Sequence, residues 1–331
     1  MIEVHDLSKR YGGTLAVDGL SFTVRPGQVT GFLGPNGSGK STTLRLILGL
    51  DAPTGGRATV NGRPYAALRH PLREVGALLD AAAVHPARSA RHHLLALAVT
   101  NGLGARRVRE VLELTGLEPA ARRRAGRFSL GMKQRLGIAA ALLGDPAVLL
   151  LDEPVNGLDP EGVQWIRTLL RRLAAEGRTV LLSSHLLSEM ALTADHLVVI
   201  GRGRLVADRS TADFLAEHAR TDVLVRCARP AELARLLRAA GAAHVGEEPD
   251  GALAVVGPEP AAIGELAAAH GIGVHELTVR RASLEQAFLD ATGEAVEYRT
   301  AERAAERTAE RAAERTADRT ADRTAAERRS A

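Results

Sequence analysis

The sequence has 331 residues, enough for two or three domains that each bury a core. The formal net charge is only +4, so composition gives no reason to expect a nucleic-acid partner. The single cysteine, Cys227, excludes a disulfide within the chain and fits a reducing compartment. No apolar run reaches about 18 residues and the first segment lacks a leader pattern. We therefore expect a soluble chain that meets a membrane only through a partner.

The first 30 residues alternate apolar and polar side chains, which predicts antiparallel strands. Tyr11 is expected in an exposed turn, either as a packing residue or as an aromatic platform for a base. An apolar run over 29–33 then leads into a glycine-rich loop, and a helix is predicted over 44–50. The loop consists of Gly34, Pro35, Asn36, Gly37, Ser38, Gly39, Lys40, Ser41 and Thr42.

Strand, glycine-rich loop and helix in this order form the setting of a phosphate-binding loop. Glycines let the backbone wrap around a phosphate with its N–H groups turned inward, and the helix N-terminus adds positive partial charge. Lys40 is placed to reach the β- and γ-phosphates, and the Ser41 hydroxyl to ligate Mg²⁺. An ordinary glycine turn would not need the whole pattern. The sequence therefore predicts a binding site for a nucleoside triphosphate.

Apolar strands alternate with helices up to about residue 200, which predicts a parallel sheet covered on both faces. Strands are expected near 58–60, 75–79, 148–151, 180–184 and 197–200, and helices within 87–124 and over 134–143. The predicted fold is α/β, a P-loop NTPase core with antiparallel N-terminal strands and a helical subdomain at about 83–140. Within that subdomain, His92 and His93 are interpreted as solvated, and Arg122 to Arg124 as a solvated helix end.

Acidic and imidazole side chains follow two of the buried strands: Asp152 and Glu153 after 148–151, and His185 after 180–184. A carboxylate beside a phosphate loop can hold Mg²⁺ directly or through water, and a second can deprotonate an attacking water. Alone, the acidic pair would be more typical of a strand-end cap. Together with the phosphate loop and His185, it favours hydrolytic chemistry.

Beyond residue 220 the predicted order is βαββαβ, the plan of a small α+β ferredoxin-like domain. A helix over 283–290 follows it. From about residue 299 the chain repeats Ala, Glu and Arg without large apolar residues, as a disordered tail or a solvated helix does. We expect a nucleotide-binding domain at 1–218, a ferredoxin-like domain at 222–292 and a low-complexity tail at 295–331.

The phosphate loop, Ser129-Leu130-Gly131-Met132, the strand ending in Asp152-Glu153, Gly157-Leu158-Asp159 and His185 together resemble the ATP-binding cassette of ABC transporters. The resemblance covers about residues 1–218. For nucleotide binding it implies that Tyr11 stacks on adenine, that Gly39 to Thr42 hold the phosphates and Mg²⁺, and that Asp152 lies in the Mg²⁺ shell. For hydrolysis it implies that Glu153 is the general base and that His185 contacts the γ-phosphate. For a second subunit it implies that Ser129 and Gly131 cap the ATP bound there and that Asp159 links the two sites. The active form is then expected to be a dimer of cassettes.

Two positions depart from the family pattern. The usual Leu-Ser-Gly-Gly-Gln signature is Phe128-Ser129-Leu130-Gly131-Met132 here, so the glutamine contact is lost. Asp80 replaces a glutamine that senses Mg²⁺ and couples to the membrane domain. An aspartate there either reaches Mg²⁺ through water or only ends its strand.

The C-terminal part, with Ser283 to Leu289 near its end, resembles the extension of daunorubicin- and bacitracin-type export ATPases. It is then a regulatory or dimer-stabilising domain, or a cover for the cassette. The expected function is ATP-driven export of a drug, antibiotic or other hydrophobic compound through separately encoded integral-membrane permease subunits, at the cytoplasmic face of the membrane and without nucleic acid. The cassette alone does not exclude import.

Two alternatives remain. A soluble ABC ATPase acting on ribosomes or nucleic acid usually has two cassettes or a long insert, and this chain has neither. A P-loop kinase would leave the Ser129–Gly131 signature and His185 unexplained.

Overall fold

The computed structural model describes residues 1–184, 187–217 and 222–280, together with Phe288. His185, the expected closing helix apart from Phe288, and the low-complexity tail therefore lie outside the described residues.

A six-stranded sheet forms the centre of the first 217 residues. Its order is β5-β6-β7-β3-β8-β9, and all neighbours are parallel except β8 and β9. The strands are β3 (Val29–Leu33), β5 (Val75–Leu78), β6 (Val148–Leu151), β7 (Thr179–Ser184), β8 (His196–Gly201) and β9 (Arg204–Ser210). Every residue of β3, β6 and β7 is buried, as expected for central strands covered on both faces. The parallel core is thus confirmed, and β9 is an antiparallel edge strand that the sequence pattern did not indicate.

A separate antiparallel sheet, of order β2-β1-β4, contains β1 (Ile2–Tyr11), β2 (Thr14–Val24) and β4 (Gly55–Val60). Ile2, Val4 and Phe22 turn inward and share one apolar core with the helix after the phosphate loop. Tyr11 pairs with Thr14 as the last residue of β1, so the expectation that it lies in a turn is wrong. The turn itself is Gly12-Gly13.

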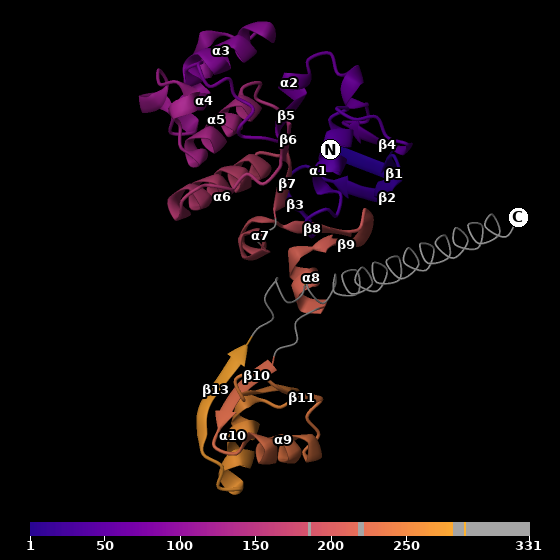
Figure 1. Ribbon diagram of the computed structural model, residues 1–331, viewed down its shortest axis with the longest axis vertical. Helices are drawn as coiled ribbons and strands as arrows, with labels where there is room; N and C mark the ends of the chain where they lie inside the picture. The colour runs from indigo at the N-terminus through magenta and orange to yellow at the C-terminus, as the bar shows by residue number, and fades with distance from the viewer. Residues whose placement is uncertain (185–186, 218–221, 281–287, 289–331) are drawn as a thin grey trace, which may run out of the picture. The chain divides into compact units, whose positions relative to one another are not determined.

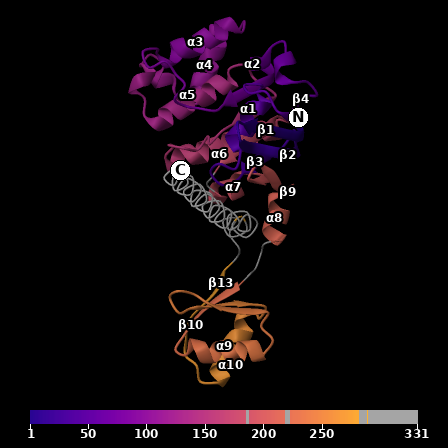
Figure 2. The ribbon, with the colours of Figure 1, turned by 45° about the vertical axis from the view of Figure 1, so that its right-hand side comes forward.

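Most helices of this part lie on one side of the six-stranded sheet, away from β1, β2 and β4 (Figures 1 and 2). The helices are α1 (Lys40–Ile47), α2 (Pro71–Glu74), α3 (Ala90–Thr100), α4 (Ala105–Leu114), α5 (Leu130–Leu142), α6 (Pro160–Ala175), α7 (Leu187–Thr193) and α8 (Thr211–Glu217), with 3₁₀ turns at Tyr65–Ala67, Glu118–Ala120 and Ala125–Arg127. Helix α1 starts four residues before the predicted Leu44 and ends near Gly49, whose φ of 62° stops the helix. Helix α5 also starts early, because Ser129 caps it by accepting the Met132 N–H.

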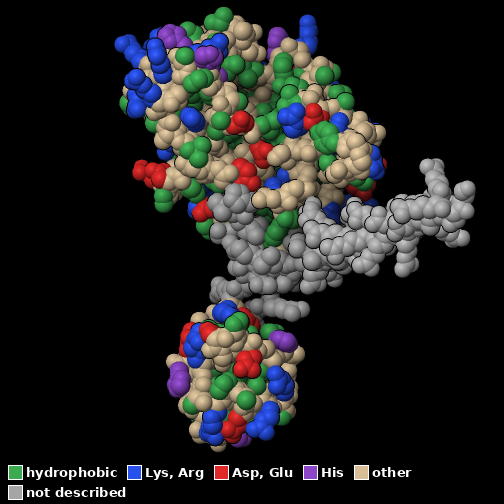
Figure 3. Space-filling view, in the orientation of Figure 1, with side chains coloured by type: hydrophobic (Ala, Val, Ile, Leu, Met, Phe, Trp, Pro, Cys, Tyr) green, Lys and Arg blue, Asp and Glu red, His purple; other side chains and the backbone are tan. Residues whose placement is uncertain are grey.

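The basic side chains of the helical part gather over α3 and α4 (Figure 3). Arg122 to Arg124 are exposed between two 3₁₀ turns, so they are solvated, and Arg124 is the N-cap of the second turn. His92 is exposed and contacts Ser89 at 2.9 Å. His93 is half-buried, and its buried Nδ1 has no hydrogen-bond partner within the described ranges, so the interpretation of His93 as solvated is wrong.

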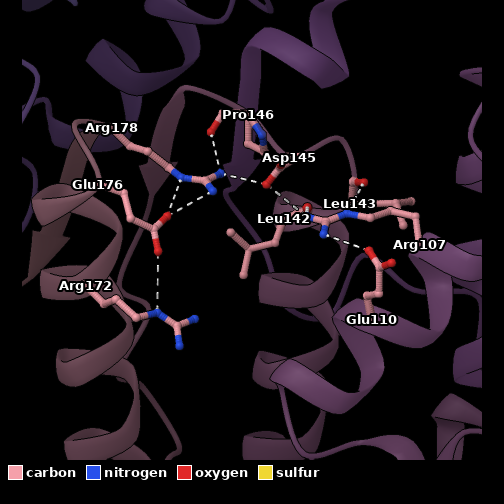
Figure 4. Close-up of polar contacts among 9 residues, drawn as sticks. All are labelled: Arg107, Glu110, Leu142, Leu143, Asp145, Pro146, Arg172, Glu176 and Arg178. Atoms are coloured by element: carbon pink, nitrogen blue, oxygen red, sulfur yellow. Dashed lines mark hydrogen bonds and ion pairs between the residues drawn. The ribbon is translucent and has the colours of Figure 1, made fainter.

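Two arginines and one aspartate tie α4 to the end of α5 and to the turn after α6 (Figure 4). Arg107 donates to the carbonyl oxygens of Leu142 at 2.8 Å and Leu143 at 3.1 Å. Asp145 lies between two guanidinium groups, 3.2 Å from Arg107 and 2.9 Å from Arg178. The arginine therefore satisfies carbonyls at a helix C-terminus that have no partner within the helix.

Residues 222–280 form a four-stranded antiparallel sheet of order β11-β12-β10-β13, with two helices on one face (Figure 2). The elements are β10 (Asp222–Cys227), α9 (Pro230–Ala239), β11 (His244–Glu247), β12 (Leu253–Val256), α10 (Pro260–Ala269) and β13 (Val274–Arg280). Their apolar side chains, such as Val225, Leu233 and Ile263, make a core of their own. This order and pairing confirm the ferredoxin-like plan.

Candidate functional site

The phosphate loop joins the end of β3 to α1 and lines a cleft of about 310 Å³ together with Asp152 and Glu153. Gly37 and Gly39 have φ of 78° and 103°, and a Cβ on Gly39 would lie 2.5 Å from the carbonyl oxygen of Ala16. Only glycine fits that position. No side chain caps α1, so its first N–H groups remain available to an anion.

Two polar groups of the loop fit a phosphate. Lys40 is buried, and its Nζ donates to the carbonyl oxygens of Gly34 at 2.5 Å and Pro35 at 3.2 Å. Burial lowers the pKa of Lys40, and the carboxylates of Glu153 and Asp152 oppose that shift. Ser38 is buried, and within the described residues its Oγ has no hydrogen-bond partner. Such a buried hydroxyl is one that a bound phosphate oxygen can satisfy.

Asp152 comes directly after β6 and faces the first turn of α1. Its Oδ2 accepts a hydrogen bond from the Ser41 hydroxyl at 2.8 Å, and its Oδ1 accepts one from Ser183. Strand β7 lies between β3 and β6, so its end brings Ser183 between the loop and the acidic pair. A serine hydroxyl and a carboxylate at one point are hard oxygen donors, the kind that suits Mg²⁺ with water and phosphate oxygens. No cluster of three His, Cys, Asp or Glu side chains gathers in the described part of the chain.

Glu153 has a φ of 49°, an uncommon value for a residue with a side chain. Its N–H donates to Ser183 Oγ at 3.0 Å, and its carbonyl oxygen accepts from Gln134 Nε2 at 3.0 Å. Both peptide groups of this residue are therefore fixed by side chains from other elements. The Glu153 side chain lines the same cleft as the phosphate loop.

Four other predicted positions of the described part of the chain, at Tyr11, Asp80, the start of α5 and Asp159, lie outside the lining of that cleft. Tyr11 is 46% exposed, and its hydroxyl donates to Asp51 at 2.8 Å. Asp80 is exposed and accepts the Ala82 N–H at 2.7 Å, which is how an aspartate ends a strand and starts a turn. Ser129 and Gly131 lie at the start of α5, and Asp159 caps α6 by accepting the Gly162 N–H at 2.8 Å.

Sequence reasoning missed three residues of this site. Ala16 contributes its carbonyl beside Gly39, Ser183 joins Asp152 to Glu153, and Gln134 holds the Glu153 carbonyl. A signal existed for Ser183, because polar residues at the carboxyl end of a buried parallel strand point to a ligand site. Gln134 is a buried polar residue on an otherwise apolar helix face, which is a weaker signal.

No helix in the described ranges combines the length and apolarity needed to cross a bilayer.

Comparison with known proteins agrees with this geometry. A family model described as "ABC transporter" matches residues 17–156, and one described as "Domain of unknown function (DUF8746)" matches residues 221–285. The chain is 36% identical to the uncharacterized ABC transporter ATP-binding protein YhcH of Bacillus subtilis (strain 168), over 90% of this chain and 97% of that protein. It is 42% identical to the bacitracin transport ATP-binding protein BcrA of Bacillus licheniformis, over 63% of this chain and 69% of the relative.

A third relative, the Nod factor export ATP-binding protein I of Rhizobium sp. (strain N33), is 38% identical over 72% of this chain and 80% of its own length. A solved structure of an ATP-binding subunit of an ABC transporter superposes with a TM-score of 0.60 at 30% identity, covering 66% of this chain and 92% of that one. From this similarity and the site geometry, the chain belongs to the ATP-binding proteins of ABC transporters, the ATPase subunits of these systems.

Proposed function

We propose that this ATPase binds ATP with Mg²⁺ in the cleft between the phosphate loop and the end of β6. The observation that carries the proposal is the convergence of Lys40, Ser41, Asp152 and Glu153 on one cleft from two separate elements, the start of α1 and the end of β6. The backbone N–H groups of Gly37 and Gly39 and the start of α1 would hold the phosphates, with Asn36, Ser38 and Thr42 around them. Ser41 and Asp152 would hold Mg²⁺, which neutralises charge on the phosphates when bound.

Glu153 would act as the general base, with its carboxylate taking a proton from the water that attacks the γ-phosphorus. The ammonium of Lys40 would stabilise the charge on the transferred phosphoryl group. His185, which follows β7 outside the described residues, is proposed to contact the γ-phosphate. The contact between Asp80 and the Ala82 N–H supports the interpretation that Asp80 ends its strand, so we do not assign it to Mg²⁺.

The working unit would be a homodimer of cassettes. Ser129 and Gly131 lie at the start of a 13-residue helix whose N-terminus favours an anion, yet they do not line the phosphate-loop cleft of their own chain. They would cap the ATP of a second subunit, and Asp159 would link the two sites. Tyr11 would stack on the adenine base.

The transport step would be export, through separately encoded integral-membrane permease subunits at the cytoplasmic face of the membrane. The names of the bacitracin and Nod factor relatives support export of a drug, antibiotic or other hydrophobic compound. Residues 222–280, with a sheet and core of their own, would form a regulatory or dimer-stabilising domain. No nucleic-acid partner is expected.

Glu153→Gln tests the chemical assignment. The variant should bind ATP with the affinity of the unaltered chain, hydrolyse it roughly a thousandfold more slowly and accumulate as an ATP-bound dimer on a sizing column. Lys40→Ala is the matched variant that tests ATP binding, and it should lose affinity for the nucleotide. Normal phosphate release by Glu153→Gln would remove this residue from its proposed role.

The transport assignment is tested by purification from membranes of the native host in mild detergent. A stoichiometric polypeptide with several apolar spans of about 20 residues should accompany the tagged chain. Recovery with ribosomes or nucleic acid from the soluble fraction would instead support a soluble ABC ATPase.

A further inference from the structure

A buried amide on α5 contacts the backbone of the proposed general base. Gln134 is 4% exposed, and its Nε2 lies 3.0 Å from the carbonyl oxygen of Glu153. An amide removed from water needs such a partner, so this contact orders the side chain as well as the carbonyl. Nothing in the hydrolytic chemistry itself uses Gln134.

The contact acts on a backbone that needs support. Glu153 has a positive φ, which a residue with a Cβ adopts only when its surroundings hold it there. Ser183 holds the N–H on one side of the Cα, and Gln134 holds the carbonyl on the other. The Asn156 N–H, at 3.2 Å, also donates to that carbonyl. The direction of the Glu153 side chain follows from these two peptide planes.

The start of α5 also packs closely on the loop that follows Glu153. A Cβ on Gly131 would lie 2.9 Å from the carbonyl oxygen of Gly157, and a Cβ on Gly157 would lie 2.3 Å from Leu130. Helix α5 thus touches this loop at Glu153 and again at Gly157. The loop is therefore fixed to α5 as well as to the strand from which it emerges.

We propose that Gln134 is a positioning residue for hydrolysis: its side-chain amide fixes the Glu153 backbone so that the carboxylate meets the attacking water. Gln134 lies one turn beyond Ser129 and Gly131, so the same helix would cap ATP in one site and align the base of the other. This inference rests on the proposed role of Glu153.

Gln134→Met is the test variant, because methionine has a similar length and no donor. In the full chain we expect kcat for phosphate release to fall about 10- to 100-fold, the loss that a misplacement near 1 Å produces, with the Kd for ATP within about twofold. In the Glu153→Gln background the same substitution should cause no further loss, and ATP-dependent dimerisation should persist. A merely structural role would lower ATP affinity and dimerisation as well.

Ile138→Val, a buried position on the same helix, is the matched control. It should lower the melting temperature without the loss of kcat. If Glu153→Gln abolishes hydrolysis while Gln134→Met keeps the kcat of the unaltered chain, Gln134 does not position the base. If Glu153→Gln itself hydrolyses ATP normally, the proposed role of Glu153 as the general base is contradicted, whatever the result for Gln134→Met.

Discussion

The hydroxyl of Tyr11 donates a hydrogen bond to Asp51 at 2.8 Å, across 40 residues of sequence. Arg45 on α1 holds the same carboxylate with both its Nε, at 2.7 Å, and an Nη, at 3.2 Å. The hydrogen bond from Arg45, and after it the one from Tyr11, lower the pKa of Asp51 to about 2. The Asp51 carboxylate is therefore ionised at any working pH. Lys9 Nζ lies 4.9 Å from the centre of the Tyr11 ring. The tip of β1 is therefore fastened to the helix of the phosphate loop.

Asp51→Ala should loosen the Tyr11 ring. If that ring stacks on adenine, the Kd for ATP should rise roughly three- to tenfold, the range of one lost aromatic contact, while tripolyphosphate binding stays unchanged. Tyr11→Phe should have a similar effect alone and none in the Asp51→Ala background. Equal losses for ATP and tripolyphosphate, measured by calorimetry, would place Asp51 outside base recognition.

Gly39→Ala should destabilise the protein more than Gly37→Ala. Both positions have positive φ, which costs a residue with a Cβ about 1–2 kcal/mol. At Gly39 the added carbon would also meet the Ala16 carbonyl at 2.5 Å, whereas at Gly37 it meets no atom within 4 Å. Urea unfolding of the two variants gives the comparison. Equal losses would show that the loop moves away from Ala16 at little cost.

Arg107→Met should lower the free energy of unfolding by about 1–3 kcal/mol, because the carbonyls of Leu142 and Leu143 at the end of α5 each lose the guanidinium as a donor. The Asp145 N–H, at 3.1 Å, still donates to the Leu142 carbonyl. The control is Arg106→Met on the same helix, where the side chain is 87% exposed and pairs only with Glu110 among the described residues. That change should stay within about 0.5 kcal/mol. Similar losses for both variants would argue against the link shown in Figure 4.

His93 should make the stability depend on pH. Burial first, and the charge of Arg88 second, lower the pKa of His93 in the folded protein below the ordinary 6.5. Between the folded-state pKa and 6.5, the unfolded chain therefore binds more protons than the folded one. Stability is then full above about pH 6.5 and falls as the pH drops towards the folded-state pKa. The loss should be under about 1 kcal/mol because the ring is only half-buried. His93→Leu should remove this part of the pH dependence, and identical melting curves against pH would contradict the assignment.

The elements that sequence alone predicted are those that local pattern specifies. The phosphate loop lies between an apolar strand and a helix, and the βαββαβ order after residue 220 follows from regular alternation and turn residues. The sequence pattern predicted the ends of these elements less accurately than their presence and type. Helix α1 begins at Lys40 because Gly39, its N-cap, adopts a positive φ, and the nearby Ala16 carbonyl leaves no room there for a Cβ. Strand β9 was missed because, as an edge strand, it has few buried residues.

The sequence by itself determined the chemistry that this protein has available: a phosphate-binding loop and an acidic pair at the end of a buried strand. Only the tertiary structure decided how these groups are held. Ser183 lies between Asp152 and Glu153 because β7 lies between β3 and β6, and Gln134 reaches Glu153 because α5 packs beside that strand end. Hydrogen bonds between side chains and distant backbone depend on how elements pack. Packing of this kind leaves no periodic signal in the chain.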